Sequence, residues 1–214
     1  MSTTKIYLIR HGQSIANEKN VFIGQTDLDL TSLGYLQAQK TAEYLKDIDV
    51  DVIYASDLLR AYHTAIPTAE RKGLRIQKNK NLREIFAGDW ENQSYEYLEK
   101  HGGDSYGIWH NNIGRACCPG GETVEQMQIR FVSEVEKIAK ENIGKTVFIF
   151  THATPLRVLT AAWNKRTMDE IKDIPWAPNA SVTRAEYSGG IFRIIDYAMD
   201  SFLGNMATAI PDNV

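Results

Sequence analysis

The sequence predicts an α/β fold, a three-layer α/β/α sandwich around a mainly parallel sheet of roughly six strands. Three short apolar runs, at residues 6–9, 50–54 and 146–150, are rich in β-branched or aromatic residues, which is typical of buried strands. Each run leads into a segment whose apolar residues recur at helical spacing. Strands that alternate with helices in this way favour a sheet covered by helices.

Further segments complete the predicted sheet. Leu74-Arg75-Ile76 is a candidate for a short strand. Residues 181–187 and 191–197 are joined by Ser188-Gly189-Gly190, a turn sequence that predicts a β-hairpin.

The first two predicted helices lie between the strands of the N-terminal half. Thr31 is a suitable N-cap for the first. Ser56 or Asp57 can cap the second, which ends at Gly73 and contains Pro67. A proline inside a helix removes a backbone donor, so we expect a kink there.

Two more helices are predicted in the C-terminal half. One begins near Glu122 and is followed by Gly144, and the other begins after His152. The first of these has apolar residues at helical spacing: Val124, Met127, Phe131, Val135 and Ile138.

Length and composition limit the kind of protein. The 214 residues contain no repeat or linker, so we expect a single domain over 1–214. A net charge of −3 does not favour a broad nucleic-acid-binding surface. No apolar run reaches membrane-spanning length, and residues 1–5 lack the apolar core of a signal peptide, so we expect a cytoplasmic protein without a membrane partner. Cys117 and Cys118 are adjacent, which suits neither a disulfide framework nor a metal site.

The ends of the three apolar strands carry the polar residues that suggest chemistry. Arg10, His11 and Gly12 follow the first, Arg60 lies in the helix after the second, and His152 follows the third. Parallel sheets bind ligands beyond the carboxyl ends of their strands, so these side chains are expected to converge. Taken singly, none of these residues indicates a function, because a histidine after a strand is usually a polar strand end and a lone arginine is most simply a solvated helix residue.

Two arginines and two histidines at one site favour a phosphate ligand, because guanidinium groups match its oxygens. Neighbouring cations would keep one imidazole neutral and able to attack phosphorus. The other histidine could stay protonated and stabilise the transferring phosphoryl group. Gly12 would let the backbone approach the phosphate closely.

These residues resemble the histidine phosphatase superfamily, whose other name is phosphoglycerate-mutase-like. The similarity covers nearly the whole chain. Its motifs are Leu8-Ile9-Arg10-His11-Gly12-Gln13-Ser14 with Asn17, Gly24-Gln25-Thr26-Asp27, Ser56-Asp57-Leu58 with Arg60-Ala61, Leu82-Arg83-Glu84, Gly88-Asp89-Trp90-Glu91, Pro119-Gly120-Gly121-Glu122 and Thr151-His152.

The resemblance implies a role for each matching residue. His11 would become phosphohistidine, and Glu84 would protonate the leaving oxygen and then activate water. Without the resemblance, Glu84 would be interpreted as a surface carboxylate. Phosphate or substrate contacts would come from Arg10, Asn17, Gln25, Thr26, Arg60, His152 and the backbone of Ala153. The resemblance implies neither a metal nor another cofactor.

The chain departs from the family pattern at two places. Ala153 follows His152 where the family often has glycine, and its backbone N–H can still point at the phosphate. Asn92 follows Gly-Asp-Trp-Glu where glycine is common, and asparagine tolerates positive φ better than most residues. Both departures are mild.

The segment after Glu84 favours a phosphatase over a mutase. Cofactor-dependent mutases of the family carry an insert with a basic run there, whereas residues 92–114 here are aromatic and acidic. We therefore expect hydrolysis of a small phosphomonoester, with a helical cap insertion at about 85–118. The aromatic residues of 92–114 could bind the leaving group or only pack the cap.

Several alternatives stay open at this stage. Phosphatases for α-ribazole, phosphoserine and broad substrate ranges look alike, and a phosphoglycerate mutase, a phosphoprotein phosphatase or a phospholigand-binding module are alternatives. The sequence does not settle whether the chain forms a homodimer, or whether residues 200–214 fold over the site.

Overall fold

The computed structural model describes residues 2–209, which contain a six-stranded sheet in the order β3-β2-β4-β1-β5-β6. Strands β1 to β4 run parallel, whereas β5 is antiparallel to β1 and to β6. The predicted mainly parallel sheet and C-terminal hairpin are therefore confirmed. The strands are β1 (Thr4–Arg10), β2 (Val52–Ala55), β3 (Ile76–Lys78), β4 (Thr146–Thr151), β5 (Val182–Ser188) and β6 (Ile191–Met199).

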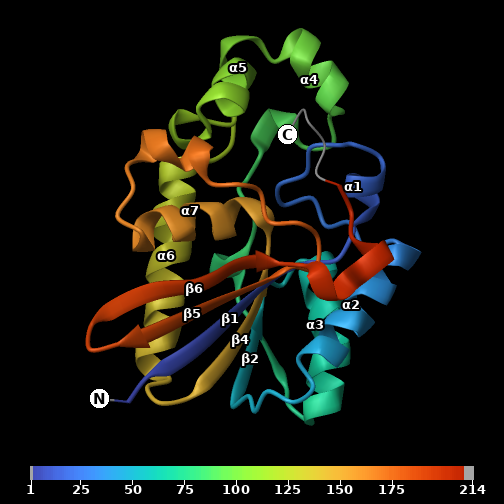
Figure 1. Ribbon diagram of the computed structural model, residues 1–214. Helices are drawn as coiled ribbons and strands as arrows, with labels where there is room; N and C mark the ends of the chain where they lie inside the picture. Colours follow the sequence, from blue (N-terminus) through green and yellow to red (C-terminus); the bar gives the residue numbers. More distant parts are fainter. Residues whose placement is uncertain (1, 210–214) are drawn as a thin grey trace.

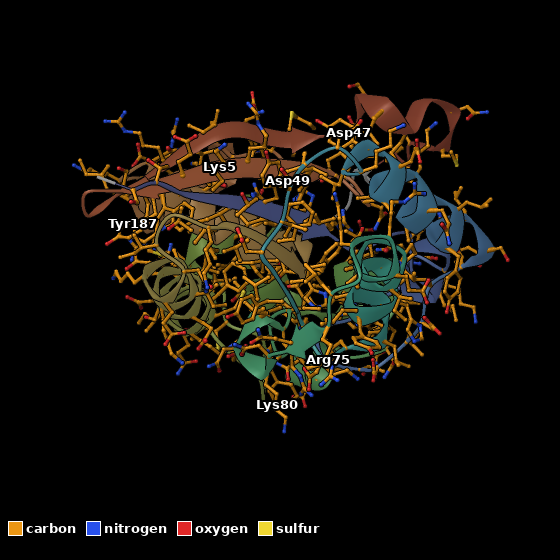
Figure 2. The ribbon with its side chains drawn as sticks, turned by 90° about the horizontal axis from the view of Figure 1, so that it is seen from below. Lys5, Asp47, Asp49, Arg75, Lys80 and Tyr187 are labelled. Atoms are coloured by element: carbon orange, nitrogen blue, oxygen red, sulfur yellow. The ribbon has the colours of Figure 1, made fainter. Side chains whose placement is uncertain are left out.

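Helices lie on both faces of this sheet. Seen from below in Figure 2, α6 lies on one side and α2 and α3 lie on the other. Their bounds are α2 (Ser32–Tyr44), α3 (Leu59–Lys72), α6 (Val124–Glu141) and α7 (Ala153–Trp163). None of the helices within residues 2–209 is long and apolar enough to cross a lipid bilayer.

Two short helices cap one end of the molecule. Helices α4 (Tyr95–His101) and α5 (Gly103–Asn111) lie beyond the carboxyl ends of the parallel strands (Figure 1). The opposite end, marked in Figure 2 by Lys5, Asp49 and Arg75, is where these strands begin. The remaining short helices are α1 (Ile15–Glu18), η1 (Lys80–Leu82), η2 (Gly88–Trp90), η3 (Ile113–Arg115), η4 (Met168–Asp173) and η5 (Ser201–Met206).

Strand β1 is buried by apolar side chains on both faces. Ile6 and Leu8 pack in a core with Phe131 of α6, whereas Ile9 packs with Phe148 on the other face. Packing on both faces leaves this strand little room to move, so the residues that follow its end are held in fixed positions.

A third core joins the cap to the body. Trp90 and Trp109 from the cap region pack with Met127 of α6 and Val158 of α7. The cap is therefore held by buried apolar contacts, which stabilise it in proportion to the area that they remove from water.

The start of α3 differs from the prediction. Its N-cap is Leu58, which makes no side-chain cap, so the expected capping by Ser56 or Asp57 is wrong in detail. The Ser56 hydroxyl accepts a hydrogen bond from Leu58 N at 3.4 Å, and the Asp27 carboxylate accepts one from Leu59 N at 2.7 Å. A residue distant in sequence thus satisfies the helix end, which local patterns do not reveal.

The end of α3 explains a second difference. The helix continues through Pro67 and ends at Gly73, whose φ of 64° is the predicted left-handed stop. Leu74 still closes the helix, because its N–H bonds to the carbonyl of Ala69. The strand expected at 74–76 therefore begins only at Ile76.

Candidate active site

The carboxyl ends of β1 and β4 bring two histidines together. Arg10 and Thr151 are register partners, and His11 N donates to the Thr151 carbonyl at 3.0 Å. The rings of His11 and His152 consequently lie with their centroids 5.2 Å apart. The expected convergence of these strand ends is confirmed.

A cleft with an open volume of about 970 Å³ lies above these strand ends. Four of the residues expected in catalysis line it, namely Arg10, His11, Arg60 and Glu84. His152 is fully buried directly beneath His11. The structure thus gathers five ionisable groups from four chain segments in one place.

His11 is held in the form that a nucleophile needs. Its Nδ1 lies 2.7 Å from the Gly12 carbonyl, which only accepts hydrogen bonds, so this nitrogen carries the proton. The lone pair is therefore on Nε2. Burial, followed by the charges of Arg60 and Arg10, lowers the pKa of His11 well below its usual value, so the imidazole is neutral at neutral pH.

Arg10 and Arg60 are anchored by neutral backbone carbonyls. Arg10 donates to Ala177 O at 2.6 Å, and Arg60 donates to Gly24 O and Thr26 O. Such bonds fix the guanidinium groups without neutralising them. Burial lowers the pKa of Arg60 to about 10, which leaves it charged at neutral pH.

The arrangement leaves donors for an anion. Within residues 2–209, Arg10 Nε and His152 Nδ1 are buried atoms without a hydrogen-bond partner. Arg10 and Arg60 also line the cleft, so their guanidinium groups can meet an anion there. The same residues contain no group of three or more His, Cys, Asp or Glu side chains that could hold a metal ion.

His152 is the second histidine of the site. It is fully buried, and its Nε2 lies 2.9 Å from the Ser56 hydroxyl. Burial, followed by Arg60 and His11, lowers its pKa well below the usual value, which favours the neutral imidazole over the protonated form that the sequence argument expects. The two nearby arginines already provide the positive charge, and a third cation would repel them.

Glu84 is an interior carboxyl group and not a surface one. It is 7% exposed, and its oxygens accept hydrogen bonds from Ile85 N at 2.8 Å and Thr154 N at 3.2 Å. Burial raises its pKa, which outweighs these hydrogen bonds. A carboxyl group that keeps its proton closer to neutral pH is suited to general acid catalysis.

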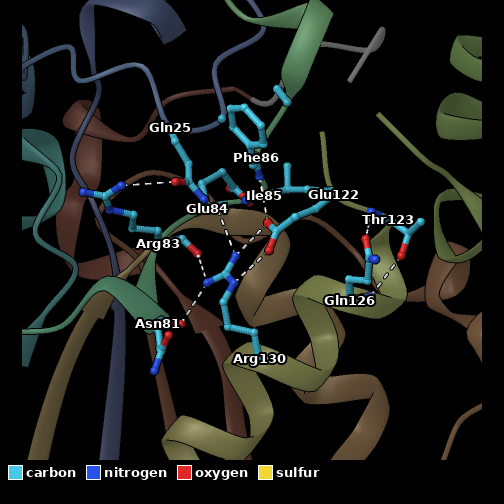
Figure 3. Close-up of polar contacts among 12 residues, drawn as sticks. Gln25, Asn81, Arg83, Glu84, Ile85, Phe86, Glu122, Thr123, Gln126 and Arg130 are labelled. Atoms are coloured by element: carbon cyan, nitrogen blue, oxygen red, sulfur yellow. Dashed lines mark hydrogen bonds and ion pairs between the residues drawn. The ribbon is translucent and has the colours of Figure 1, made fainter. Parts of the chain in front are cut away.

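A bidentate ion pair secures the chain segment that carries Glu84. Arg130 of α6 binds the Glu122 carboxylate through two bonds of 2.9 Å (Figure 3). The same guanidinium donates to the backbone carbonyls of Asn81, Arg83 and Glu84. Arg130 thus fixes this backbone from below, a role that the sequence motifs do not reveal.

Gln25 and Thr26 lie behind the cleft, and neither is among the described residues that line it. Gln25 donates to the Glu84 carbonyl at 3.2 Å, and the Thr26 carbonyl accepts from Arg60. Their backbone N–H groups bind the Glu91 carboxylate. These contacts position the acid and one arginine, and a contact of Gln25 or Thr26 with substrate stays a prediction.

Asn17 and Ala153 both line the cleft, as expected. The side-chain oxygen of Asn17 accepts from Ser14 N and from the amide of Asn179, each at 3.1 Å. Asn179 also donates to the His11 carbonyl at 3.2 Å. Asn179 is a cleft residue that sequence reasoning missed, because no motif marks the loop before β5.

The C-terminal segment reaches the cleft, which answers part of the question that the sequence left open. Thr208 and Ala209 line it, and the Thr208 hydroxyl donates to Asn179 Oδ1 at 3.1 Å. Gln37 of α2 donates to the Met206 carbonyl at 2.7 Å. Residues 210–214 lie outside the described residues.

The aromatic residues of the cap divide into two groups. Tyr95 and Trp109 line the cleft, although Trp109 is also buried in the cap core. Tyr106 belongs only to that core, and Tyr97 is exposed. Trp176, which sequence reasoning missed, adds a further aromatic wall from the loop before β5.

The packing of the loop that carries His11 gives one reason why residue 12 is a glycine. A Cβ at this position would lie 2.5 Å from the Gly34 carbonyl oxygen at the start of α2. Its N–H donates to the Thr64 hydroxyl at 3.0 Å. The close approach is therefore to a neighbouring helix, which packs against the loop that carries His11.

Asn92 adopts the conformation that the sequence argument anticipated. Its φ is 65°, in the left-handed region that favours glycine and, less strongly, asparagine. Its side-chain amide donates to the Thr26 hydroxyl at 3.2 Å. The departure from the family's glycine is thus accommodated.

Comparison with known proteins gives consistent matches. The model of the histidine phosphatase superfamily (branch 1) matches residues 6–200. Phosphoserine phosphatase 1 of Hydrogenobacter thermophilus is 30% identical over 74% of this chain and 75% of its own. The 2,3-bisphosphoglycerate-dependent phosphoglycerate mutase of Cytophaga hutchinsonii is 31% identical over 82% of this chain and 84% of its own.

Among solved structures, Bacillus stearothermophilus YhfR superposes with a TM-score of 0.89 at 28% identity, covering 94% of this chain and 99% of its own. The phosphoserine phosphatase and the phosphoglycerate mutase are thus similar to this chain to nearly the same degree. Overall identity does not distinguish the two reactions, and the residues of the cleft have to do so.

Proposed function

The chain belongs to the histidine phosphatase superfamily, and on that basis we propose that it hydrolyses a small organic phosphomonoester through a phosphohistidine on His11. The observation that carries the proposal is the state of His11. Its imidazole is neutral, with the proton on Nδ1 held by Gly12, between two anchored arginines and opposite a buried carboxyl group.

In the first half-reaction, Arg10 and Arg60 bind the phosphoryl oxygens, and His11 Nε2 attacks phosphorus. The N–P bond forms as the P–O bond to the leaving group breaks. Glu84 gives its proton to the departing oxygen, since an alkoxide is otherwise a poor leaving group. The raised pKa of Glu84 keeps that proton available.

In the second half-reaction, the Glu84 carboxylate takes a proton from water as the water oxygen attacks the phosphohistidine. The N–P bond breaks, inorganic phosphate forms, and His11 returns to its neutral form. We assign to His152, whose ring centroid lies 5.2 Å from that of His11, a hydrogen bond to a phosphoryl oxygen in both steps.

Trapping the intermediate tests the mechanism. Enzyme mixed with ³²P-labelled substrate and quenched in alkaline detergent should carry label on His11, because phosphohistidine is stable in base. His11→Ala should remove both the label and the turnover. Full turnover by this variant would contradict the proposal.

The acceptor of the phosphoryl group is tested separately. A hydrolase releases inorganic phosphate, whereas a mutase converts 3- to 2-phosphoglycerate with stimulation by 2,3-bisphosphoglycerate. We expect release to dominate, because Arg10 and Arg60 are the only Arg or Lys side chains among the described residues lining the cleft. A binding module without activity would retain phosphopeptide and release no phosphate.

A further inference from the structure

The cleft has a part that the phosphoryl chemistry does not use. His11, Arg10 and Arg60 lie at its base. The walls around them include α1 with the loop that follows it, one residue each of α4 and α5, and the loop before β5. A leaving group attached to the bound phosphoryl group has to occupy this part. Its side chains therefore determine which phosphomonoesters are accepted.

The charges of the cleft are balanced by a single phosphate. Arg10 and Arg60 are the cationic side chains among the described lining residues, and Glu84 is the acidic one. In the proposed reaction Glu84 enters as the proton donor, so a phosphate dianion matches the charge of the two guanidinium groups. A second phosphate or a carboxylate on the leaving group would meet no cation, and an unpaired charge away from water is costly.

Aromatic rings form the wall beyond the phosphoryl site. Phe22, Tyr95, Trp109 and Trp176 line the cleft. The rings of Phe22 and Trp109 lie 4.9 Å apart at an interplanar angle of 68°, and Trp109 lies 6.4 Å from Trp176 at 30°. Such clusters favour edge or offset contacts with a further ring.

The Trp176 ring is held in place by a cation–π contact with Arg157. The Arg157 guanidinium lies 4.4 Å from the ring centroid and is tied to the carbonyls of Ile174 and Lys172. Arg157 is 7% exposed and does not line the cleft. The cation thus fixes the indole plane without presenting its charge to a ligand.

We propose that this wall is a binding subsite for an uncharged, ring-bearing leaving group, so that the substrate is an aryl, benzyl or nucleoside-type phosphomonoester. Asn20 lines the same cleft and offers its side-chain amide to polar atoms on such a ring system. The inference rests on the proposed hydrolase function and specifies its substrate class.

Matched substrates separate ring from charge. Benzyl phosphate, 4-carboxybenzyl phosphate and ethyl phosphate all release an alkoxide, and the first two differ only in a remote carboxylate. We expect kcat/KM for benzyl phosphate to exceed that for the carboxylated analogue by roughly tenfold or more. Phosphoserine should be used as poorly as the carboxylated analogue.

Variants test the wall itself. Trp176→Leu should lower kcat/KM for benzyl phosphate about three- to tenfold and leave ethyl phosphate nearly unchanged. The control is Trp163→Leu, a half-buried tryptophan of α7 that stacks on Phe192 away from the cleft. Val21→Arg adds a cation to the cleft wall. It should therefore reduce the difference in kcat/KM between benzyl phosphate and 4-carboxybenzyl phosphate.

Two results would overturn the inference alone. One is a higher kcat/KM for phosphoserine or 4-carboxybenzyl phosphate than for benzyl phosphate. The other is an equal loss for benzyl and ethyl phosphate in folded Trp176→Leu. If no substrate releases phosphate and His11 is never labelled, the proposed hydrolase function fails as well.

Discussion

Glu84 shows how a single residue acquires a chemical role from its surroundings. Burial raises the pKa of its carboxyl group, so Glu84→Gln removes a proton donor while keeping the size of the side chain. We expect kcat/KM for an alkyl phosphate to fall by about 10²–10⁴. The loss for p-nitrophenyl phosphate should be much smaller, because its leaving group departs without protonation.

Steady-state kinetics with both substrates check this role. The matched control is Glu96→Gln, a change at an exposed carboxylate of α4. It should leave kcat/KM unchanged for both substrates. An equal loss for both substrates in Glu84→Gln would instead indicate that the variant disturbs phosphate binding.

The two buried histidines predict a pH dependence of stability. Burial and the neighbouring cations lower the pKa values of His11 and His152 in the folded protein. Between those lowered values and the unfolded value of about 6.5, the unfolded state binds more protons. The free energy of unfolding should therefore fall as the pH falls below about 6.5.

Urea unfolding at a series of pH values measures this effect. The double variant His11→Gln with His152→Gln should show a shallower fall, and the comparison cancels the opposite contribution of Glu84, whose pKa is raised. Titration of the imidazole ¹⁵N signals gives the same information directly. Histidine signals at residues 11 and 152 that titrate at 6.5 or above would contradict it.

For single residues, prediction from sequence succeeds where the role of a residue follows from its place at a strand end. Arg10, His11 and His152 lie at the strand ends that the sequence predicts, and the two imidazole rings lie close together. Trp176 and Thr208 were missed, because loop and terminal packing bring them to the cleft and no local pattern encodes it.

Among the elements, the C-terminal segment contributes two residues, Thr208 and Ala209, to the wall of the cleft. The hydrogen bond from Thr208 to Asn179 links it to the loop that carries His11. Deleting residues 207–214 should raise KM about fivefold through the loss of this bond and of the cleft wall. Because the arginines stay anchored, kcat should change less.

Deleting only 210–214 is the matched control, since it keeps both Thr208 and Ala209. Thr208→Val is the more conservative test, because it removes the hydroxyl with little change in size. Unchanged KM in both Thr208→Val and the longer deletion would show that the segment does not contribute to substrate binding.

The elements themselves were largely predictable, because apolar periodicity records which face of a strand or helix is buried. The boundaries of α3 and β3 were less so. Asp27 satisfies the start of α3 from outside the helix, and Leu74 extends its end, so both boundaries depend on contacts beyond the local sequence.

For the molecule as a whole, the cap and the sandwich share buried apolar contacts. Trp90 and Trp109 pack with side chains of α6 and α7, so the cap cannot open without exposing them. Shared burial of this kind couples the two parts, and we expect one cooperative unfolding transition. Tryptophan fluorescence and far-UV circular dichroism should therefore report the same midpoint.

Binding of inorganic phosphate should stabilise this cooperative unit as a whole. The folded cleft presents two anchored arginines, whose guanidinium groups can bind an anion. At a concentration of about 100 times Kd, a ligand that binds only the folded state adds about 2.7 kcal/mol to the free energy of unfolding. For a chain of this size, that corresponds to a rise in Tm of roughly 5 to 10 °C.

Thermal unfolding with and without phosphate, followed by both probes, tests coupling and binding together. Arg10→Leu should reduce the rise in Tm that phosphate causes. Arg184→Leu, at an exposed ion pair on β5, should leave that rise unchanged. A rise seen by fluorescence but absent from circular dichroism would mean that the cap closes on phosphate independently of the sheet. Coincident shifts follow from the packing, because the loop that carries Glu84 and the helices beneath the cap belong to one buried core.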